Sequence, residues 1–338
     1  MPKRFRGGIL QARLPEISAI ANTVVSGIYN TADVSQYTGS GNWAVNPIYQ
    51  QYGTPGTYSF IVPNEVYTIS ILAVGAGGAG DDGNSGDGGG GGGASGACAV
   101  ASNVAVIPGN TITVVVGAGG ASGQGKGVRA ESGGNTTVTI GSFIMNAVGG
   151  QGGGPYSANP GATGANAVFT SISAGVVTAG YIGGNGGRAF DGGGGGGGAA
   201  GAAGNGGTGS GGMDVTTTNA PTNSYAGGGG GAFSAGGTGS LGGANGGTGQ
   251  QNITGGGGGG AYTFTSITEF LNTNGSDGNG LNTAGSKGGD GGFPGGGGGG
   301  SYDINVGVAS SGAKGFVRIV WGNNSSGVRK FPDNALDT

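Results

Sequence analysis

The sequence has no histidine, one cysteine and few charged residues, and each shortage excludes a class of protein. Without histidine, the chain cannot activate a serine or cysteine nucleophile through an imidazole, and it offers no imidazole ligand to a metal. The lone Cys98 cannot form an intrachain disulfide, and its alanine neighbours predict a small buried packing residue. No stretch approaches the roughly 20 apolar residues of a membrane-spanning helix, so we expect no membrane insertion.

Charge is sparse and nearly balanced, since charged residues make up 8% of the chain and the formal net charge is −3. Between Ser132 and Ser286 only Arg188 is basic. A nucleic-acid-binding protein would carry a basic patch, so we expect no nucleic-acid partner. The N-terminal stretch MPKRFRGGILQARLPEIS is interrupted by Arg13 and Glu16, which argues against a signal peptide. We therefore expect a protein that is made in a cytoplasm and stabilised without disulfides.

Acidic residues are the remaining candidates for chemistry. Apart from Asp81 and Asp82, they are scattered singly, so no segment positions the carboxylate pair of a glycan depolymerase, and we expect no enzyme. The stretch DDGNSGDGG (81–89) is the best candidate for calcium. Its spacing does not match an EF-hand loop, because Gly86 stands at a ligand position and no glutamate closes the loop. We therefore predict no metal site and no cofactor.

Glycine is what the sequence has in abundance. There are 95 glycines, and only seven of them precede Gly75. From Gly75 onward, one residue in three is glycine, which is the fraction found in collagen, but the strict Gly-X-Y repeat is missing. Ordering so much glycine costs backbone entropy, so this region is either disordered or needs glycine for close backbone packing. Recurring strand segments and a hydrophobic content of 34% favour the ordered alternative.

Two glycine patterns typical of nucleotide-binding proteins lack the context that those sites require. VYTISILAVGAGGAGDD (66–82) contains G-x-G-x-x-G at 75–80, a pattern that opens a helix in dinucleotide-binding folds. The glycine-rich residues after Gly80 cannot form that helix. GASGQGKG (120–127) has the P-loop spacing as far as Lys126, but Gly127 stands where a serine or threonine must bind Mg²⁺. We predict that neither stretch holds a nucleotide.

Short alternating segments separated by turn residues predict an all-β fold. Short strands at regular spacing with glycine turns are typical of a β-sandwich. We expect Phe60, Val114 and Trp321 in its core, with Val317 and Ile319 on the same strand face as Trp321. The expected strands are 56–63, 66–74, two within 97–120 around Pro108-Gly109-Asn110, two within 135–150, a weaker pair within 167–184, and 315–322.

The glycine runs form a repeat of their own. Each run is followed by alanine or serine, and three of these are followed by an aromatic residue. Oligoglycine can adopt the threefold polyproline II helix, which has no internal hydrogen bonds, so such helices must bond to one another when buried. We therefore predict β-sandwich-like strands interleaved with a bundle of polyglycine II helices. The runs are 88–93, 192–198, 227–231, 255–260 and 295–300.

Composition divides the chain into four regions. Residues 1–50 have ordinary glycine content and are too few for a core of their own. Residues 51–184 are expected to form a β-rich, glycine-containing domain, and 185–300 a polyglycine II region. Residues 301–338 are expected to supply a C-terminal strand and tail that close the β domain.

Three stretches carry a resemblance to a known family. VPNEVYTISILAVGAGGAG (62–80), followed by VIPGNTITVVVGAGG (106–120), resembles the glycine-rich domain of bacteriophage tail fibres and adhesins, and is similar to glycine-rich receptor modules in animals. The ending GFVRIVWG…VRKFP (315–332) resembles that of marine-phage virion proteins. SGIYNTADVSQYTGSGNWAVNP (26–47) is similar to an element near the N-terminus of phage structural proteins, although here AVNP follows Trp43 in place of proline.

The resemblance implies a phage virion structural protein, a tail fibre or adhesin, located in the phage tail or an appendage and assembled in the host cytoplasm. It implies a homotrimer, which would also satisfy exposed strand edges. The N-terminal segment would bind other virion proteins, and the glycine-rich body would contact a host-surface glycan or protein. The alternative is an architectural virion protein, such as a head fibre, decoration or baseplate component, that binds only other virion proteins.

If the protein is a tail fibre or adhesin, as the resemblance implies, aromatic residues near the glycine runs are the candidate receptor contacts. Each of them could instead cover the edge of a glycine bundle or pack between subunits. The candidates are Tyr156, Tyr181, Phe190, Tyr225, Phe233, Tyr262 and Tyr302, and the candidate attachment residues are Ile28, Tyr29, Trp43 and Pro47.

Overall fold

The computed structural model gives an all-β fold with no helix in the residues that it describes. Of the predicted N-terminal segment, residues 1–50, the structure describes only 48–50. The described residues are 48–83, 88–121, 128–155, 161–189, 193–202, 204–209, 211, 288–301, 310–324, 327–328 and 331.

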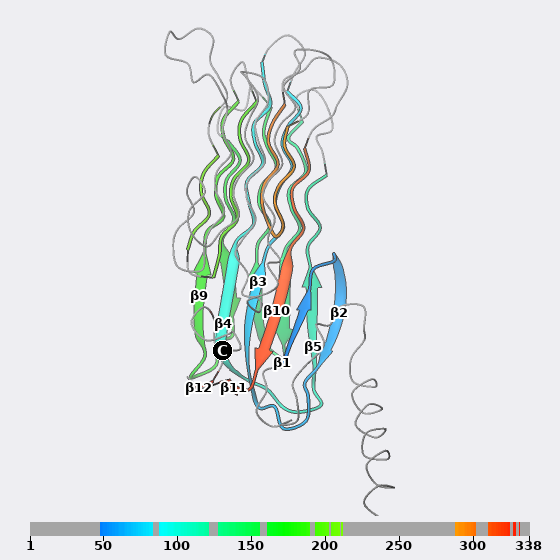
Figure 1. The fold of residues 1–338 in the computed structure, drawn as a ribbon, viewed down its shortest axis with the longest axis vertical. Coiled ribbons are helices and arrows are strands. Elements are labelled where there is room, and N and C mark those ends of the chain that lie inside the picture. Colours follow the sequence, from blue (N-terminus) through cyan, green and yellow to red (C-terminus); the bar gives the residue numbers. More distant parts are fainter. Residues whose placement is uncertain are drawn as a thin grey trace, which may run out of the picture.

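Two five-stranded antiparallel sheets form a β-sandwich (Figure 1). In sheet 1 the strand order is β1 (Ile48–Tyr52), β10 (Phe316–Trp321), β3 (Thr68–Val74), β4 (Cys98–Ala105) and β9 (Val177–Tyr181). In sheet 2 the order is β2 (Gly56–Ile61), β5 (Thr111–Val116), β6 (Thr136–Ile140), β7 (Phe143–Ala147) and β8 (Ala167–Thr170). After β10, the chain forms a short pair of antiparallel strands, β11 (Asn323–Asn324) and β12 (Gly327–Val328).

The predicted strands are confirmed, and the structure adds their partners. Within the two large sheets, β6 and β7 form a tight hairpin, with Gly141 at φ +57° in the two-residue connection. The turn at Pro108-Gly109-Asn110 is present, but it carries the chain from β4 in sheet 1 to β5 in sheet 2. β1 was not predicted, and it pairs with β10 at the edge of sheet 1.

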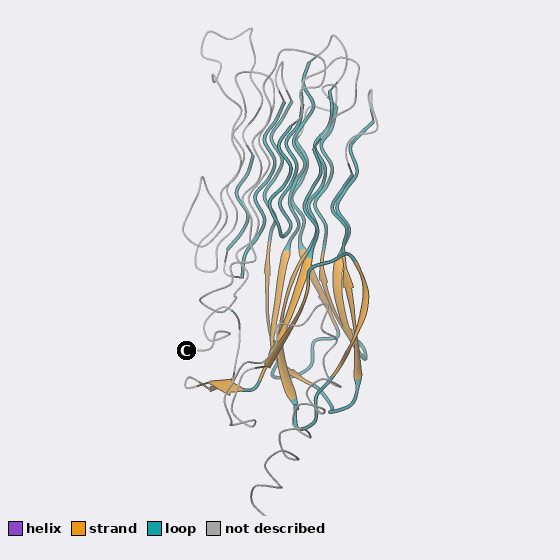
Figure 2. Cartoon of the chain, turned by 45° about the vertical axis from the view of Figure 1, so that its right-hand side comes forward, coloured by secondary structure: helices purple, strands orange, loops and turns teal. Residues whose placement is uncertain are grey.

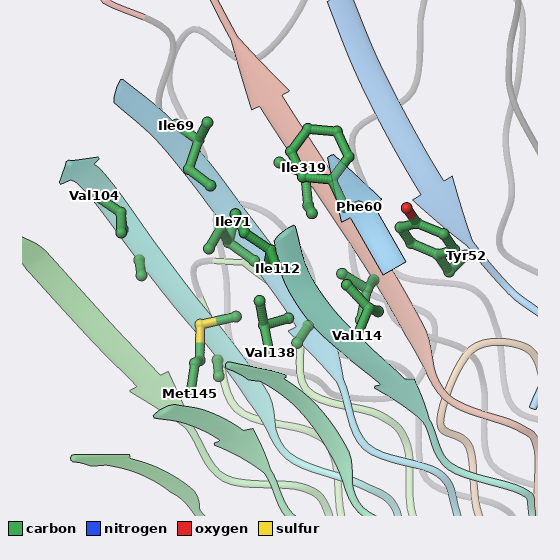
Figure 3. Close-up of a cluster of buried hydrophobic side chains, with 14 of the residues drawn as sticks. Tyr52, Phe60, Ile69, Ile71, Val104, Ile112, Val114, Val138, Met145 and Ile319 are labelled. Carbon is green, nitrogen blue, oxygen red and sulfur yellow. The ribbon is translucent and has the colours of Figure 1, made fainter. Parts of the chain in front are cut away.

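A hydrophobic core fills the space between the sheets (Figure 3). The predicted core residues Phe60, Val114 and Trp321 are buried, and the rings of Phe60 and Trp321 lie 5.4 Å apart between centroids. Val317 and Ile319 join Trp321 in this cluster, as the alternation along β10 predicts. The remaining large side chains include Ile71, Ile112, Val138 and Met145.

Sheet 1 is also buried on its outer face, because another part of the same chain covers it. Leu72, Val320 and Phe316 pack there against Ala199 and Ala200 from the glycine-rich region. This second covering layer explains why β3 and β10 are buried along nearly their whole length, whereas β5 alternates. Cys98 lies in this layer, fully buried with a free thiol, as predicted.

The glycine-rich segments extend from the strand ends of the sandwich as a separate part of the molecule, called here the glycine body (Figures 1 and 2). They run side by side in extended form, away from the sheets. In the described chain, the body comprises residues 75–83, 88–97, 117–121, 128–135, 148–155, 161–166, 182–189, 193–202, 204–209, 288–301 and 310–315.

Backbone hydrogen bonds in the glycine body repeat every third residue. In the segment after β3, each set of N–H groups three residues apart donates to one neighbouring segment, and the three sets serve three different neighbours. The first set, Gly75, Gly78 and Asp81, donates to Ala97, Ala94 and Gly91 in that order. The second set, Ala76 and Ala79, donates to Gly134 and Glu131. The third set, Gly77 and Gly80, donates to Ala313 and Ser310, and all seven bonds measure 2.8–3.1 Å. The segment before β4 repeats this arrangement with three other neighbours.

Glycine is required in the body because the backbones approach each other closely. A Cβ added to Gly78 would overlap the carbonyl oxygen of Gln151, and one added to Gly93 would overlap that of Gly78. The body is therefore held together mainly by backbone hydrogen bonds, in contrast to the side-chain core of the sandwich.

Candidate functional site

The end of the glycine body that lies farthest from the sheets is the candidate site, and we call it the distal end. There the bonded chain segments form a last layer, in which Asp81 donates to Gly91, Gly91 donates to Gly154, and Ser301 donates to the carbonyl oxygen of Asp81. Within the described chain, the distal end comprises residues 80–83, 88–91, 153–155, 193–194 and 299–301. Several chain segments that are far apart in sequence therefore come together at one end of the molecule (Figure 1).

Asp81 is the most buried acidic side chain at the distal end. The residue is 1% exposed, and its Oδ1 accepts a 2.9 Å hydrogen bond from the N–H of Gly83. Oδ2 is buried without a hydrogen-bond partner. The chain turns directly after this pair of acids, since Gly83 has φ +75°, a conformation that glycine adopts without strain.

Asp82 adds a second buried carboxylate next to the first. It is 7% exposed, and its Oδ1 is also buried without a hydrogen-bond partner. Burial raises the pKa of the Asp82 carboxyl, against a hydrogen bond from its own backbone N–H that lowers it. Two adjacent carboxylates with unsatisfied oxygens are an unusual feature of a protein interior, where buried polar atoms normally have partners.

The electrostatic balance at Asp81 is dominated by burial. Burial raises the pKa of the Asp81 carboxyl from 3.8 to about 7, while the hydrogen bond from Gly83 lowers it. The charge of Asp82 raises this pKa further, and the charge of Arg129 lowers it. Arg129 is itself directed to the backbone, because its Nη1 donates a 2.8 Å hydrogen bond to the carbonyl oxygen of Gly152.

The G-x-G-x-x-G pattern at residues 75–80 does not open a helix in this structure. The backbone from Gly75 to Gly80 continues β3 as an extended segment whose N–H groups are bonded to neighbouring glycine-body segments. Lys126 lies outside the described residues. Among the residues that the structure describes, no three acidic, histidine or cysteine side chains gather as a metal cluster, and no helix could span a membrane.

Tyr181 is the one predicted receptor contact that the structure describes. It is the last residue of β9, where it pairs with Cys98, and its half-buried side chain packs against the outer layer of sheet 1. Tyr181 thus lies where the sandwich meets the glycine body, away from the distal end. The other candidates lie outside the described residues, and these are Tyr156, Phe190, Tyr225, Phe233, Tyr262 and Tyr302, together with Ile28, Tyr29, Trp43 and Pro47.

Three of these candidates directly follow described segments that run outward through the body. Tyr156 follows Pro155, and Tyr302 follows Ser301, which belongs to the last bonded layer. Phe190 follows Ala189, two residues after Gly187, which bonds to the segment that contains Gly92.

A family model described as a glycine-rich domain matches residues 53–280, which is more than half of the chain. The chain belongs to the glycine-rich domain family. No curated protein matches it. The family match begins just before β2 and includes β9, but excludes β1 and β10, which complete sheet 1 of this glycine-rich domain from segments on either side.

Proposed function

We propose that this glycine-rich protein is a structural subunit of a bacteriophage particle, a tail fibre or adhesin, that recognises the host surface with the distal end of its glycine body. The observation that carries the proposal is the convergence of sequence-distant segments at one end of a body bonded through its backbone. Such an arrangement suits recognition, because a rigid scaffold can present variable connecting stretches at a fixed position.

The finer architecture of the glycine body is part of the same proposal. We infer that its segments are polyglycine II helices, which have three residues per turn, rise about 3.1 Å per residue and form no internal hydrogen bonds. Support comes from the period of three in the donors of the segment 75–81, which serves three neighbours in turn. A β-strand would direct its hydrogen bonds to two neighbours with a period of two.

The two ends of the molecule would then have different roles. Ile48 pairs with Trp321 at the end of sheet 1 that is remote from the glycine body, whereas Val74 pairs with Phe316 beside it. The chain therefore enters β1 at the end opposite the distal end. This polarity supports attachment to the particle through the residues that precede β1, including Trp43 and Pro47, and recognition at the other end.

The proposed recognition surface consists of the stretches that continue from the distal end. Tyr156, Phe190 and Tyr302 are its leading aromatic contacts, with Tyr225, Phe233 and Tyr262 supplied by the longer stretch that precedes residue 288. We assign Tyr181 a lesser role, because it packs on sheet 1. The partner would be a host-surface glycan or protein, and the working form a homotrimer in the virion. We propose no enzymatic activity for the chain.

An architectural virion protein remains the second candidate function. It is favoured by the exposed part of the sandwich, where Glu65 is the single charged residue among those that the structure describes. Surfaces buried in permanent assemblies are depleted in charge, so this face would suit contact with other virion proteins.

Adsorption competition separates the two functions. Labelled full-length protein is added to susceptible host cells before the phage, and the proposal predicts saturable binding that blocks infection. A variant with Tyr156→Ala, Phe190→Ala and Tyr302→Ala should lose this binding while its unfolding temperature is retained. Tyr67→Ala is the matched control, because Tyr67 is an exposed aromatic residue of the sandwich. No binding by folded wild-type protein would overturn the adhesin proposal and favour the architectural one.

A further inference from the structure

We propose that Asp81 and Asp82 bind a calcium ion at the distal end of the glycine body. The observation is a pair of buried carboxylates with oxygens that have no protein partner, Oδ2 of Asp81 and Oδ1 of Asp82. An isolated buried carboxylate is costly unless it is paired, hydrogen-bonded or coordinated to a metal. A bound cation would supply the partner that these carboxylate oxygens lack.

The protein alone compensates these charges only in part. The N–H of Gly83 serves one oxygen of Asp81 and leaves the other without a donor. Arg129 contributes a favourable charge, but burial outweighs it, and the pKa of the Asp81 carboxyl is raised in spite of both. The segments around the pair are mainly glycine, so few neighbouring side chains are present to provide further donors.

Main-chain oxygens lie close to the same turn. A Cβ placed on Gly83 would lie 2.9 Å from the carbonyl oxygen of Gly88 and 3.1 Å from that of Ser301. The Ser301 oxygen already accepts a hydrogen bond from Gly90. We take these main-chain oxygens as candidate additional ligands, and water molecules would complete the coordination shell.

The donor set selects calcium among the common cations. Carboxylate and carbonyl oxygens are hard ligands, which suit Ca²⁺ and Mg²⁺ and not the softer metals that prefer nitrogen or sulfur. Nitrogen and sulfur ligands are scarce, since the chain has no histidine and its one thiol, Cys98, is buried in sheet 1. Adjacent residues and a main-chain oxygen form an irregular set, which Ca²⁺ tolerates better than Mg²⁺ because Mg²⁺ requires a near-octahedral shell.

The spacing in the sequence predicted no metal here, and the structure supplies the reason to revise that expectation. The EF-hand comparison tests whether ligands are spaced along a single loop. It does not test burial, and Asp81 is buried in a part of the body where its backbone bonds to Gly91 and Ser301 from two other segments. The proposed site thus differs from an EF-hand in using two adjacent carboxylates.

Calcium binding is tested on the full-length chain by isothermal titration with CaCl₂ after dialysis against EDTA, and by thermal unfolding with and without calcium. The expected affinity is that of extracellular calcium modules, roughly 10⁻⁴–10⁻³ M. At ten times the dissociation constant, calcium should raise the unfolding temperature by about 2 °C or more. MgCl₂ at the same concentration should produce a smaller shift.

Three amide variants complete the test. Asp81→Asn and Asp82→Asn should each abolish the calcium-dependent shift, and in EDTA they should unfold at or above the wild-type temperature because an unpaired charge is removed. Asp290→Asn is the matched control and should keep the full calcium response, because this carboxylate accepts hydrogen bonds from the N–H and Oγ of Ser311.

Two results would overturn the proposal: no calcium-dependent heat or shift in the wild-type protein, or a shift that persists in both the Asp81 and the Asp82 variant. The inference is independent of the proposed function, since a protein that binds calcium here without adsorbing to any host would still uphold it.

Discussion

The sandwich and the glycine body are two solutions to the same problem, the burial of a backbone that must keep its hydrogen bonds. The sandwich pairs strands in two directions and fills the space between its sheets with large side chains such as Phe60 and Met145. The body omits side chains at most positions, so that each segment can bond to three neighbours instead of two. Tolerance to substitution should therefore be opposite in the two regions, since adding atoms disrupts the body and removing atoms disrupts the sandwich.

The largest effect is expected from adding a methyl group to the glycine body. Gly93→Ala would place a Cβ on the carbonyl oxygens of Gly78 and Ala79, so backbone segments would have to separate. We expect a loss of about 4 kcal/mol or more, or failure to fold. Soluble yield and denaturant unfolding measure this.

The control is Gly91→Ala, two residues earlier in the same run. Its Cβ would lie 3.0 Å from the carbonyl oxygen of Gly154, so a small shift of the neighbour can accommodate it. A markedly smaller loss is expected. Equal losses in the two variants would show that glycine is needed there for a reason other than close packing.

A slightly smaller effect is expected from truncating the sandwich core. Phe60→Ala leaves a cavity beside the Trp321 ring and should cost about 3–4 kcal/mol. Tyr67→Ala, at a side chain that is 66% exposed, should stay within about 0.5 kcal/mol of wild type. Chemical denaturation monitored by tryptophan fluorescence gives both values, and a Phe60 variant as stable as the Tyr67 variant would contradict the assigned core.

A moderate effect is expected where a side chain bridges the glycine body. The Ser95 hydroxyl donates a 2.6 Å hydrogen bond to the carbonyl oxygen of Gly198 and accepts a 2.7 Å bond from the N–H of Gly184. Ser95→Ala should cost about 1–2 kcal/mol, whereas Ser59→Ala, at an exposed position of β2, should cost almost nothing. Denaturant midpoints measure both variants. An unchanged midpoint for Ser95→Ala would show that this hydroxyl does not stabilise the glycine body.

The smallest effect concerns reactivity and leaves stability untouched. Burial raises the pKa of the Cys98 thiol, so alkylating reagents should not modify the folded protein at neutral pH. Ser59→Cys supplies an exposed thiol as the positive control. Mass spectrometry after a timed reaction measures both, and rapid labelling of Cys98 in native protein would show that the layer of residues 199–202 opens readily.

The sequence predicts the strands well because their evidence is local. The alternation along β5, the shared face of the apolar residues along β10 and the Pro108-Gly109-Asn110 turn are short-range signals, and the structure confirms them. The partner of each strand is not a local property, so β4 and β5 could be placed beside one turn but not assigned to different sheets. β1 was missed because IYQQY carries two glutamines and no clear alternation, and its pairing with β10 links residues at opposite ends of the chain.

The candidate site was harder to predict for a related reason. Asp81 and Asp82 are visible in the sequence as adjacent acids, but their burial is a property of the folded body, in which Asp81 bonds through its backbone to Gly91 and Ser301 on other segments. No periodicity within the stretch 81–89 reports such packing. The signal that could have identified the pair is physical: two acids directly before a run in which the backbone must pack without side chains.

The central claim is that the distal end recognises the host, and hydrogen–deuterium exchange of the full-length protein tests it most directly. The protein is labelled alone and with surface vesicles from a susceptible host. The account predicts slower exchange on binding in peptides that cover the distal end and the stretches that continue from it, 80–91, 153–160, 188–194, 299–309 and the stretch that precedes residue 288, with the strands of the sandwich unchanged. Protection confined to the sandwich, or bound protein without slower exchange in any of these peptides, would contradict it.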